Sequence, residues 1–237
     1  MIYKPSKALD TFDSDIQPIL NRLDSLKNQQ DIISEYKDDI LFSSIFLSHA
    51  YFENYIDDIF SSYTKSFANF KLIDLPDYLK AFYFYKAIPD KVHKLAVGFE
   101  NEETTLATLQ STLRNPNQLL NLHATLPQYA LKGDFLYERK KYPSVDNLNI
   151  IYKRIGIKKI FNEVSRELKS DAQSYLESLS SLRTTLAHNG ELVGISFDDV
   201  ILSLEKFIKF VEGLDKVLHK HLLRELGDAF WNIEISS

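Results

Sequence analysis

Apolar residues return every three or four positions along most of this chain, which is the spacing of one face of an α-helix and not the alternation of a β-strand. The longest such run, from Asp31 to about Phe70, is too long for an isolated surface helix. We therefore expect an all-α helical bundle with this run as its central helix. The long helices are expected at residues 8–29, 31–70, 147–154, 157–189 and 196–226.

Two of the expected helix ends carry specific signals. Ser196 and Asp199 have the spacing of a capping box, in which each side chain bonds the main-chain N–H of the other, so a helix should begin there. Asn189 followed by Gly190 should end the preceding helix, because both residues tolerate a left-handed backbone.

Residues 71–135 replace the long pattern with short segments and contain prolines at positions 76, 89, 116 and 127. We interpret this part as a helical insertion between the halves of the bundle, and the polar stretch 132–143 as a loop. The aromatic run from Tyr78 to Tyr85 fits either a packed helix face or a surface that stacks nucleic-acid bases. The short helices are expected at about 77–86, 89–98, 102–114 and 116–125.

The chain of 237 residues contains no cysteine, which excludes disulfides, zinc–thiolate sites and thiol nucleophiles. No segment has the pattern of a signal peptide or a membrane span, so we expect a cytoplasmic protein without membrane contact. The net charge of −5 argues against a general nucleic-acid coat. The charge is uneven, because residues 138–169 hold nine Lys or Arg against four acids.

This basic stretch leads to the segment that carries the candidate chemistry, where Arg183 precedes His188 by five positions near a helix end. Arginine offers a permanent charge and a planar set of donors, and histidine carries a proton near neutral pH, so the pair suits phosphate chemistry without a metal. The structural alternative is that Arg183 satisfies carbonyl groups at the helix end and that His188 caps it. The spacing by itself leaves both interpretations open.

His49 and Glu53 lie four positions apart in the central helix, beside the aromatic residues Phe52 and Tyr55. One interpretation is an exposed ion pair next to the buried stripe, and the other is a carboxylate directed towards a functional site. The remaining histidines have no carboxylate or cysteine partner at ligand spacing, so no metal site and no cofactor are expected.

Two motifs resemble the HEPN superfamily. The run from Asn147 to Ile157 contains an Ile-Gly turn, and the run from Ser181 to Glu191 contains the Arg-His pair. Together they are similar to the RiboL-PSP-HEPN and related HEPN-like nuclease branch, in which such a helix precedes an Arg-polar-x-x-Ala-His-Gly signature. The resemblance marks residues 143–225 as the HEPN core, and Phe52-Glu53 is similar to the aromatic-Glu feature of the same branch.

The resemblance implies one HEPN-like domain over residues 1–237, folded as an up-and-down bundle and paired as a homodimer with the Arg-His motifs at a shared cleft. Many members are metal-independent endoribonucleases of toxin–antitoxin, anti-phage or RNA-processing systems. RNA is thus the expected substrate, and a cognate antitoxin or operon partner is a further expected partner.

In that family chemistry the ribose 2′-hydroxyl attacks the phosphate, His188 moves the proton and Arg183 stabilises the phosphorane. The resemblance gives Thr184, Asn189 and Glu53 supporting or RNA-contacting roles.

Two positions depart from the pattern of active relatives. Thr184 stands where they often carry Asn, Asp or His, and Gly190 stands where some carry a tyrosine that is adenylylated. A second interpretation therefore stays open, a non-catalytic HEPN module that binds RNA or a partner protein. A third is a helical adaptor unrelated to HEPN.

Overall fold

The described part of the structure, a computed structural model, consists of helices and their connections, and contains no strand. Most of the insertion predicted over 71–135 lies outside the described residues, with three of its four expected short helices. Of the helix expected at 77–86, which holds the aromatic run, residues 77–79 and 82 are described and are helical. The described residues are 2–29, 36–67, 70, 75–79, 82, 133–138, 142, 144–189, 194–227 and 231, without the side chains of 134–135 and 187–189.

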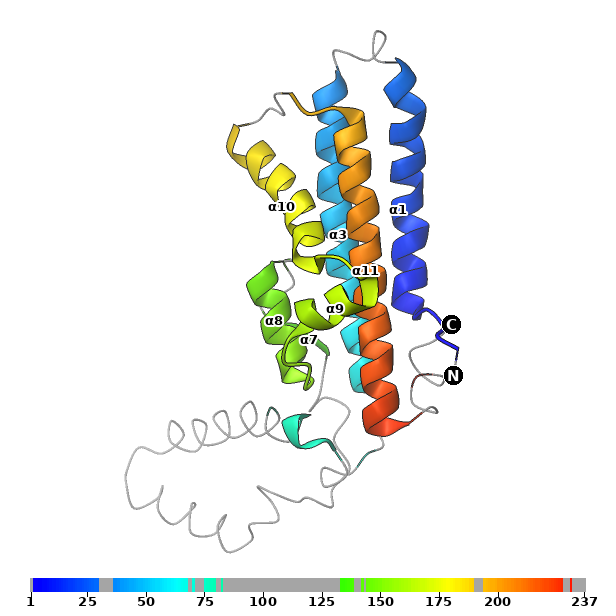
Figure 1. Ribbon diagram of the computed structural model, residues 1–237, viewed down its shortest axis with the longest axis vertical. Helices are drawn as coiled ribbons and strands as arrows, with labels where there is room; N and C mark the ends of the chain where they lie inside the picture. The colour runs from blue at the N-terminus through cyan, green and yellow to red at the C-terminus, as the bar shows by residue number, and fades with distance from the viewer. Residues whose placement is uncertain are drawn as a thin grey trace, which may run out of the picture.

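Four long helices form the bundle, and each runs opposite to the one before it in the series (Figure 1). α1 (Lys7–Leu26) and α3 (Lys37–Lys65) pack side by side, and α11 (Phe197–Leu226) packs against both. α10 (Ala172–Asn189) covers α3 and α11. The expected all-α, up-and-down bundle is confirmed.

Three shorter helices pack at the lower half of the bundle in Figure 1. α7 (Gly133–Tyr137) contacts α3, and α9 (Ile160–Leu168) packs on α11 and α10. α8 (Val145–Arg154) lies between them and contacts both α7 and α9. A 3-10 turn, Lys27–Gln29, extends α1, so the helix expected at 8–29 is confirmed.

The helix signals in the sequence are confirmed where they were strongest. Ser196 accepts the N–H of Asp199 and the Asp199 carboxylate accepts the N–H of Ser196, which is the expected capping box of α11. This helix extends to Leu226, and α10 ends at Asn189, as the sequence predicts.

The single helix expected over 157–189 is wrong, because the chain breaks between α9 and α10. Lys169 adopts a left-handed conformation with φ 54°, and its N–H bonds the carbonyl of Ser165. The Ser165 hydroxyl then accepts the N–H of Ala172 at 3.0 Å and so satisfies the first turn of α10. The apolar spacing continues across the break because both helices bury residues in the same core.

The loop expected over 132–143 is also wrong for its first residues, which form α7. A Cβ atom at Gly133 would lie 2.6 Å from the main-chain nitrogen of Ser61, so only glycine permits this approach to α3. Leu136 is buried, and the Tyr137 hydroxyl bonds Asp57 of α3. Burial against α3 thus makes helical a stretch whose local sequence indicates a loop.

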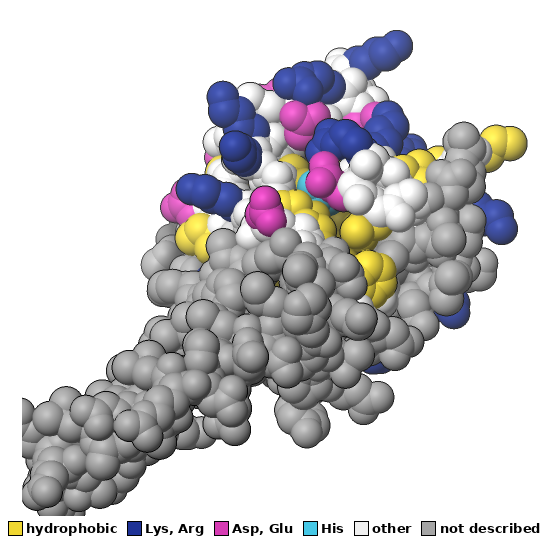
Figure 2. Space-filling view, turned by 90° about the horizontal axis from the view of Figure 1, so that it is seen from below, with side chains coloured by type: hydrophobic (Ala, Val, Ile, Leu, Met, Phe, Trp, Pro, Cys, Tyr) yellow, Lys and Arg dark blue, Asp and Glu magenta, His cyan; other side chains and the backbone are white. Residues whose placement is uncertain are grey.

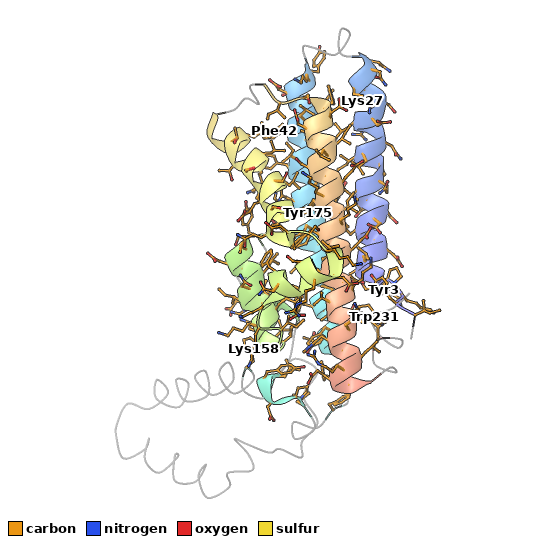
Figure 3. The ribbon with its side chains drawn as sticks, in the orientation of Figure 1. Tyr3, Lys27, Phe42, Lys158, Tyr175 and Trp231 are labelled. Atoms are coloured by element: carbon orange, nitrogen blue, oxygen red, sulfur yellow. The ribbon has the colours of Figure 1, made fainter. Side chains whose placement is uncertain are left out.

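The N-terminal residues are fixed to the core by one buried carboxylate, Asp215 of α11. It accepts the Tyr3 hydroxyl at 2.8 Å, the main-chain N–H and the hydroxyl of Ser6, and the Tyr55 hydroxyl at 3.3 Å. Burial raises the pKa of Asp215, and these donors act in the opposite direction. Trp231 donates its indole N–H to the carbonyl of Lys4, so this residue packs on the N-terminal segment beside Tyr3 (Figure 3).

Candidate functional site

The arginine of the candidate motif is held by two aromatic rings. The guanidinium carbon of Arg183 lies 5.0 Å from the centre of the Phe46 ring on α3 and 4.7 Å from that of Tyr142, which precedes α8. Such contacts attract the cation to the ring faces and restrict its orientation. Among the described residues Arg183 has no ion-pair or hydrogen-bond partner, and its Nε atom is buried. Within the described part of the chain, its charge is therefore not neutralised by an acidic side chain.

His49 lies beneath this arginine. Its side chain is 2% exposed, its ring is nearly parallel to that of Tyr142 at 6.1 Å, and it also contacts Phe207. Burial lowers the pKa of His49 to about 4, and the charge of Arg183 contributes to this. The carbonyl of Leu179 acts in the opposite direction, although its geometry falls short of a hydrogen bond. His49 is thus neutral near pH 7.

The exposed ion pair between His49 and Glu53 is a wrong interpretation of their spacing. Both ring nitrogens of His49 are buried without a hydrogen-bond partner, so Glu53 does not pair with it. Glu53 is partly exposed on α3, and no hydrogen bond or ion pair joins it to Arg183. The sequence contained the signal for this burial, because His49 lies four positions after Ile45 and three before Phe52 on the apolar face.

The residue after the arginine, Thr184, is exposed, and its hydroxyl donates to the carbonyl of Ser180 at 2.9 Å. This bond to the preceding turn occupies the only proton of the hydroxyl. The oxygen of Thr184 remains able to accept a hydrogen bond.

His188 and Asn189 belong to the last turn of α10, and their side chains lie outside the described part of the structure. Five residues along a regular α-helix correspond to about 7.5 Å of rise and about 140° of rotation. Arg183 and His188 therefore start from different sides of α10, so one helix does not by its regular geometry aim both at one point.

A pocket of about 490 Å³ adjoins Tyr142 between the start of α8 and α10. It is lined by the carboxylates of Asp146 and Glu177 and by the hydroxyls of Ser144 and Ser180. Two carboxylates repel a phosphate, whereas acceptors and hydroxyls suit sugar or base hydrogen bonds. Tyr142 thus contacts Arg183 and also lines a pocket that carries two carboxylates.

Phe46 and Tyr142 are functional candidates that the sequence did not reveal. Tyr142 lies 41 positions before Arg183 in the expected loop, so no helical spacing connects the two. Phe46 belongs to an expected helix, but its spacing predicts only that it packs. The described residues contain no group of three or more His, Asp or Glu arranged to hold a metal ion.

A comparison with protein families matches this chain to the RiboL-PSP-HEPN family over residues 14–220. Membership of this family supports an RNA-related function of the HEPN type. No curated protein and no solved structure matches the chain. Within the described residues, no helix is both long and apolar enough to span a bilayer.

Proposed function

Because the chain belongs to the RiboL-PSP-HEPN family, we propose that it is a metal-independent endoribonuclease with Arg183 and His188 as its catalytic residues. The observation that carries the proposal is the state of Arg183, a partly buried cation that contacts two aromatic rings and has no carboxylate partner among the described residues. An arginine that only stabilised the fold would be expected to bond a carbonyl or an acid.

In the proposed reaction the ribose 2′-oxygen attacks the adjacent phosphorus and the bond from phosphorus to the 5′-oxygen breaks. One proton leaves the 2′-hydroxyl and another reaches the 5′-oxygen, and His188 transfers a proton as base or acid. Arg183 stabilises the negative charge that gathers on the non-bridging oxygens. The products are a 2′,3′-cyclic phosphate and a 5′-hydroxyl.

The buried His49 supports the catalytic arginine in this proposal. Because His49 is neutral near pH 7, it adds no second positive charge beneath the guanidinium. Thr184 offers its oxygen as an acceptor beside the bound RNA, and Asn189 contacts phosphate. Glu53 has a supporting or RNA-contacting role, as the family resemblance implies.

We further propose that two copies of the chain pair near Arg183. Phe42 and Leu47 on the first half of α3 are exposed at 40% and 42%, and Tyr36, the residue before the helix, is exposed at 57%. Phe42 stacks on Phe46 at 4.4 Å, so its exposed ring adjoins the support of Arg183, while Tyr36 and Leu47 line the groove towards α1. A two-fold axis there would bring two motifs together, and one His188 could act as base while the other acts as acid.

The test measures cleavage of RNA by the purified protein in EDTA. His188→Ala and Arg183→Ala should each abolish cleavage and leave the melting temperature near that of the wild type. Gln17→Ala, a change at an exposed position of α1 that does not line the pocket beside Tyr142, is the control and should cleave normally. Undiminished cleavage by both active-site variants would remove the proposed site.

A second candidate function is a non-catalytic module that binds RNA or a partner protein. The bond between the Thr184 hydroxyl and the Ser180 carbonyl favours it, because that hydroxyl has no proton left to donate to a phosphate. Such a module binds RNA without cleaving it. Toxicity on expression, relieved by His188→Ala, would instead favour a toxin or anti-phage nuclease controlled by a cognate antitoxin.

A further inference from the structure

A second cationic feature lies at the other end of the bundle from Arg183. A pocket of about 630 Å³ opens between α9 and α11, next to the turn that joins α8 to α9. Figure 2 views the lower end of the molecule, and Lys and Arg side chains predominate on the described part of that face. The pocket is lined by five Lys or Arg side chains, Lys158, Lys159, Arg166, Lys220 and Arg224, and by two glutamates.

The two glutamates do not neutralise the whole pocket. Glu163 pairs with Arg166 at 2.9 Å, and Glu167 pairs with Lys220. Lys158 and Lys159 are exposed, and neither has an ion-pair partner among the described residues. These two lysines thus contribute uncompensated positive charge at the rim.

The remaining cation, Arg224, is held in place by a buried histidine. The Nε2 atom of His221 lies 2.8 Å from the carbonyl oxygen of Ile155, and a carbonyl can only accept, so Nε2 carries the proton. The Nδ1 atom therefore accepts from Nη2 of Arg224 at 3.1 Å. Burial lowers the pKa of His221, which keeps this neutral form. Arg224 also bonds Glu225 through Nε, so its donors are only partly used.

The backbone around the pocket favours an anion as well. Gly156 has φ +92°, and a Cβ there would lie 2.7 Å from the ring of Tyr78, so the turn requires glycine. The turn leads into α9, whose N-cap residue Lys159 makes no side-chain capping bond. The first N–H groups of α9 are thus not capped by a side chain, beside the two free lysines.

From these contacts we infer that the pocket binds phosphate groups of the RNA backbone, away from the bond that is cleaved. The inference rests on the proposed function only in that RNA is the ligand. Phosphates are the anions that several spaced Lys and Arg side chains bind together.

The position of the pocket sets the length of RNA that reaches both sites. Ser203 of α11 bonds Ser178 of α10 at 2.9 Å, and Lys220 lies 17 positions further along α11. That interval is about 25 Å of helix. Arg183 is farther still from Lys220, because α10 runs opposite to α11 (Figure 1). Lys158 and Phe42 mark the two ends in Figure 3.

The five residues from Ser178 to Arg183 add about 7.5 Å. A stacked strand advances roughly 3.4 Å per nucleotide, so an RNA bound at both places spans on the order of ten nucleotides. RNAs much shorter than this reach Arg183 without reaching the pocket. The dependence of binding and cleavage on RNA length therefore distinguishes the contribution of the pocket from that of Arg183.

The experiment compares Lys158→Glu/Lys159→Glu with the control Lys7→Glu/Lys209→Glu, which makes the same charge change at two exposed lysines outside the pocket. Binding of a 20-nucleotide 2′-O-methyl RNA, which lacks the attacking hydroxyl, is followed by fluorescence anisotropy over a salt series. The pocket variant should bind about tenfold more weakly, and its slope of log K against log salt should fall by about 1.4, at roughly 0.7 per lost phosphate contact.

Cleavage supplies a second measurement. The pocket variant should lower kcat/KM for a cleavable 20-nucleotide RNA and leave that for a 4-nucleotide RNA unchanged. The inference would be overturned if the pocket and control variants bound the long RNA equally well, or if the wild type did not bind it at all. Binding that depends on the pocket in a wild type that never cleaves would keep the inference and refute the nuclease proposal.

Discussion

The guanidinium carbon of Arg183 lies 4.7 Å from the centre of the Tyr142 ring, and the same ring is stacked on the buried His49. Tyr142 therefore contacts both a cation without an acidic partner among the described residues and a histidine that is shielded from solvent. Its position makes it a positioning residue for Arg183 in the proposed reaction.

Truncation of Tyr142 should weaken catalysis through the arginine. Tyr142→Ala removes one face of the support and should lower kcat/KM for RNA cleavage by about tenfold, the equivalent of a moderately buried cation–π contact. Tyr142→Phe keeps the ring and should stay near the wild-type value. A loss of equal size in both variants would assign the effect to the hydroxyl and contradict the positioning role.

Arg183→Lys should not rescue activity, although it keeps the charge. An ammonium group lacks the planar fork that contacts the rings of Phe46 and Tyr142 and that can bind a phosphate through two donors. We expect kcat to fall by about 10²-fold or more, as on removal of a transition-state donor. Single-turnover cleavage assays measure this, and near-normal rates would show that charge alone suffices.

His49 should make the protein less stable as the pH falls. The imidazole has a pKa of about 4 in the folded chain against the ordinary 6.5, so the unfolded chain binds the proton more tightly. The free energy of unfolding should therefore decrease between about pH 6.5 and pH 4.

The measure is urea denaturation of the wild type and of His49→Leu at pH 7 and pH 4.5. The wild type should lose roughly 2 to 3 kcal/mol more than the variant over this range. Other titrating groups are common to both proteins, so their contributions cancel. An equal loss in the two would show that His49 titrates normally.

Asp215 should be a major determinant of stability. Asp215→Ala leaves the donors of Tyr3, Ser6 and Tyr55 without their shared acceptor, which should cost about 3 kcal/mol or more of unfolding free energy. The control is Asp198→Ala on the same helix, whose side chain is 74% exposed and 3.6 Å from Lys27. That change should cost less than about 0.5 kcal/mol.

Gly156→Ala should destabilise the turn that carries the basic pocket. The new Cβ meets the Tyr78 ring at 2.7 Å in addition to the unfavourable positive φ. Gly194→Ala has a similar φ of +77° with nothing within 4 Å, so it measures the backbone cost alone. Gly156→Ala should lower the melting temperature more than Gly194→Ala does, and the difference measures the clash with Tyr78. Equal losses in the two variants would mean that Tyr78 moves aside freely.

Local signals in the sequence determined the helices wherever a residue and its near neighbours suffice. The capping box of Ser196 and Asp199, the end of α10 at Asn189 and the apolar faces of α1, α8 and α11 follow from hydrogen bonds and spacing within a few residues. The family resemblance likewise rests on short motifs, and the family comparison confirms it over residues 14–220.

The tertiary structure alone decided which residues surround Arg183 and where the long pattern breaks. Periodicity shows that a face is apolar but not what covers it. The apolar spacing thus indicated that His49 is buried, but the contacts of Phe46 and Tyr142 with Arg183 depended on how α3 and the segment before α8 meet α10. The break at Lys169 escaped the sequence for the same reason, because α9 and α10 share a core and keep the spacing through a left-handed residue. Contacts between residues far apart in the chain thus built the candidate site, while contacts between neighbours built its helices.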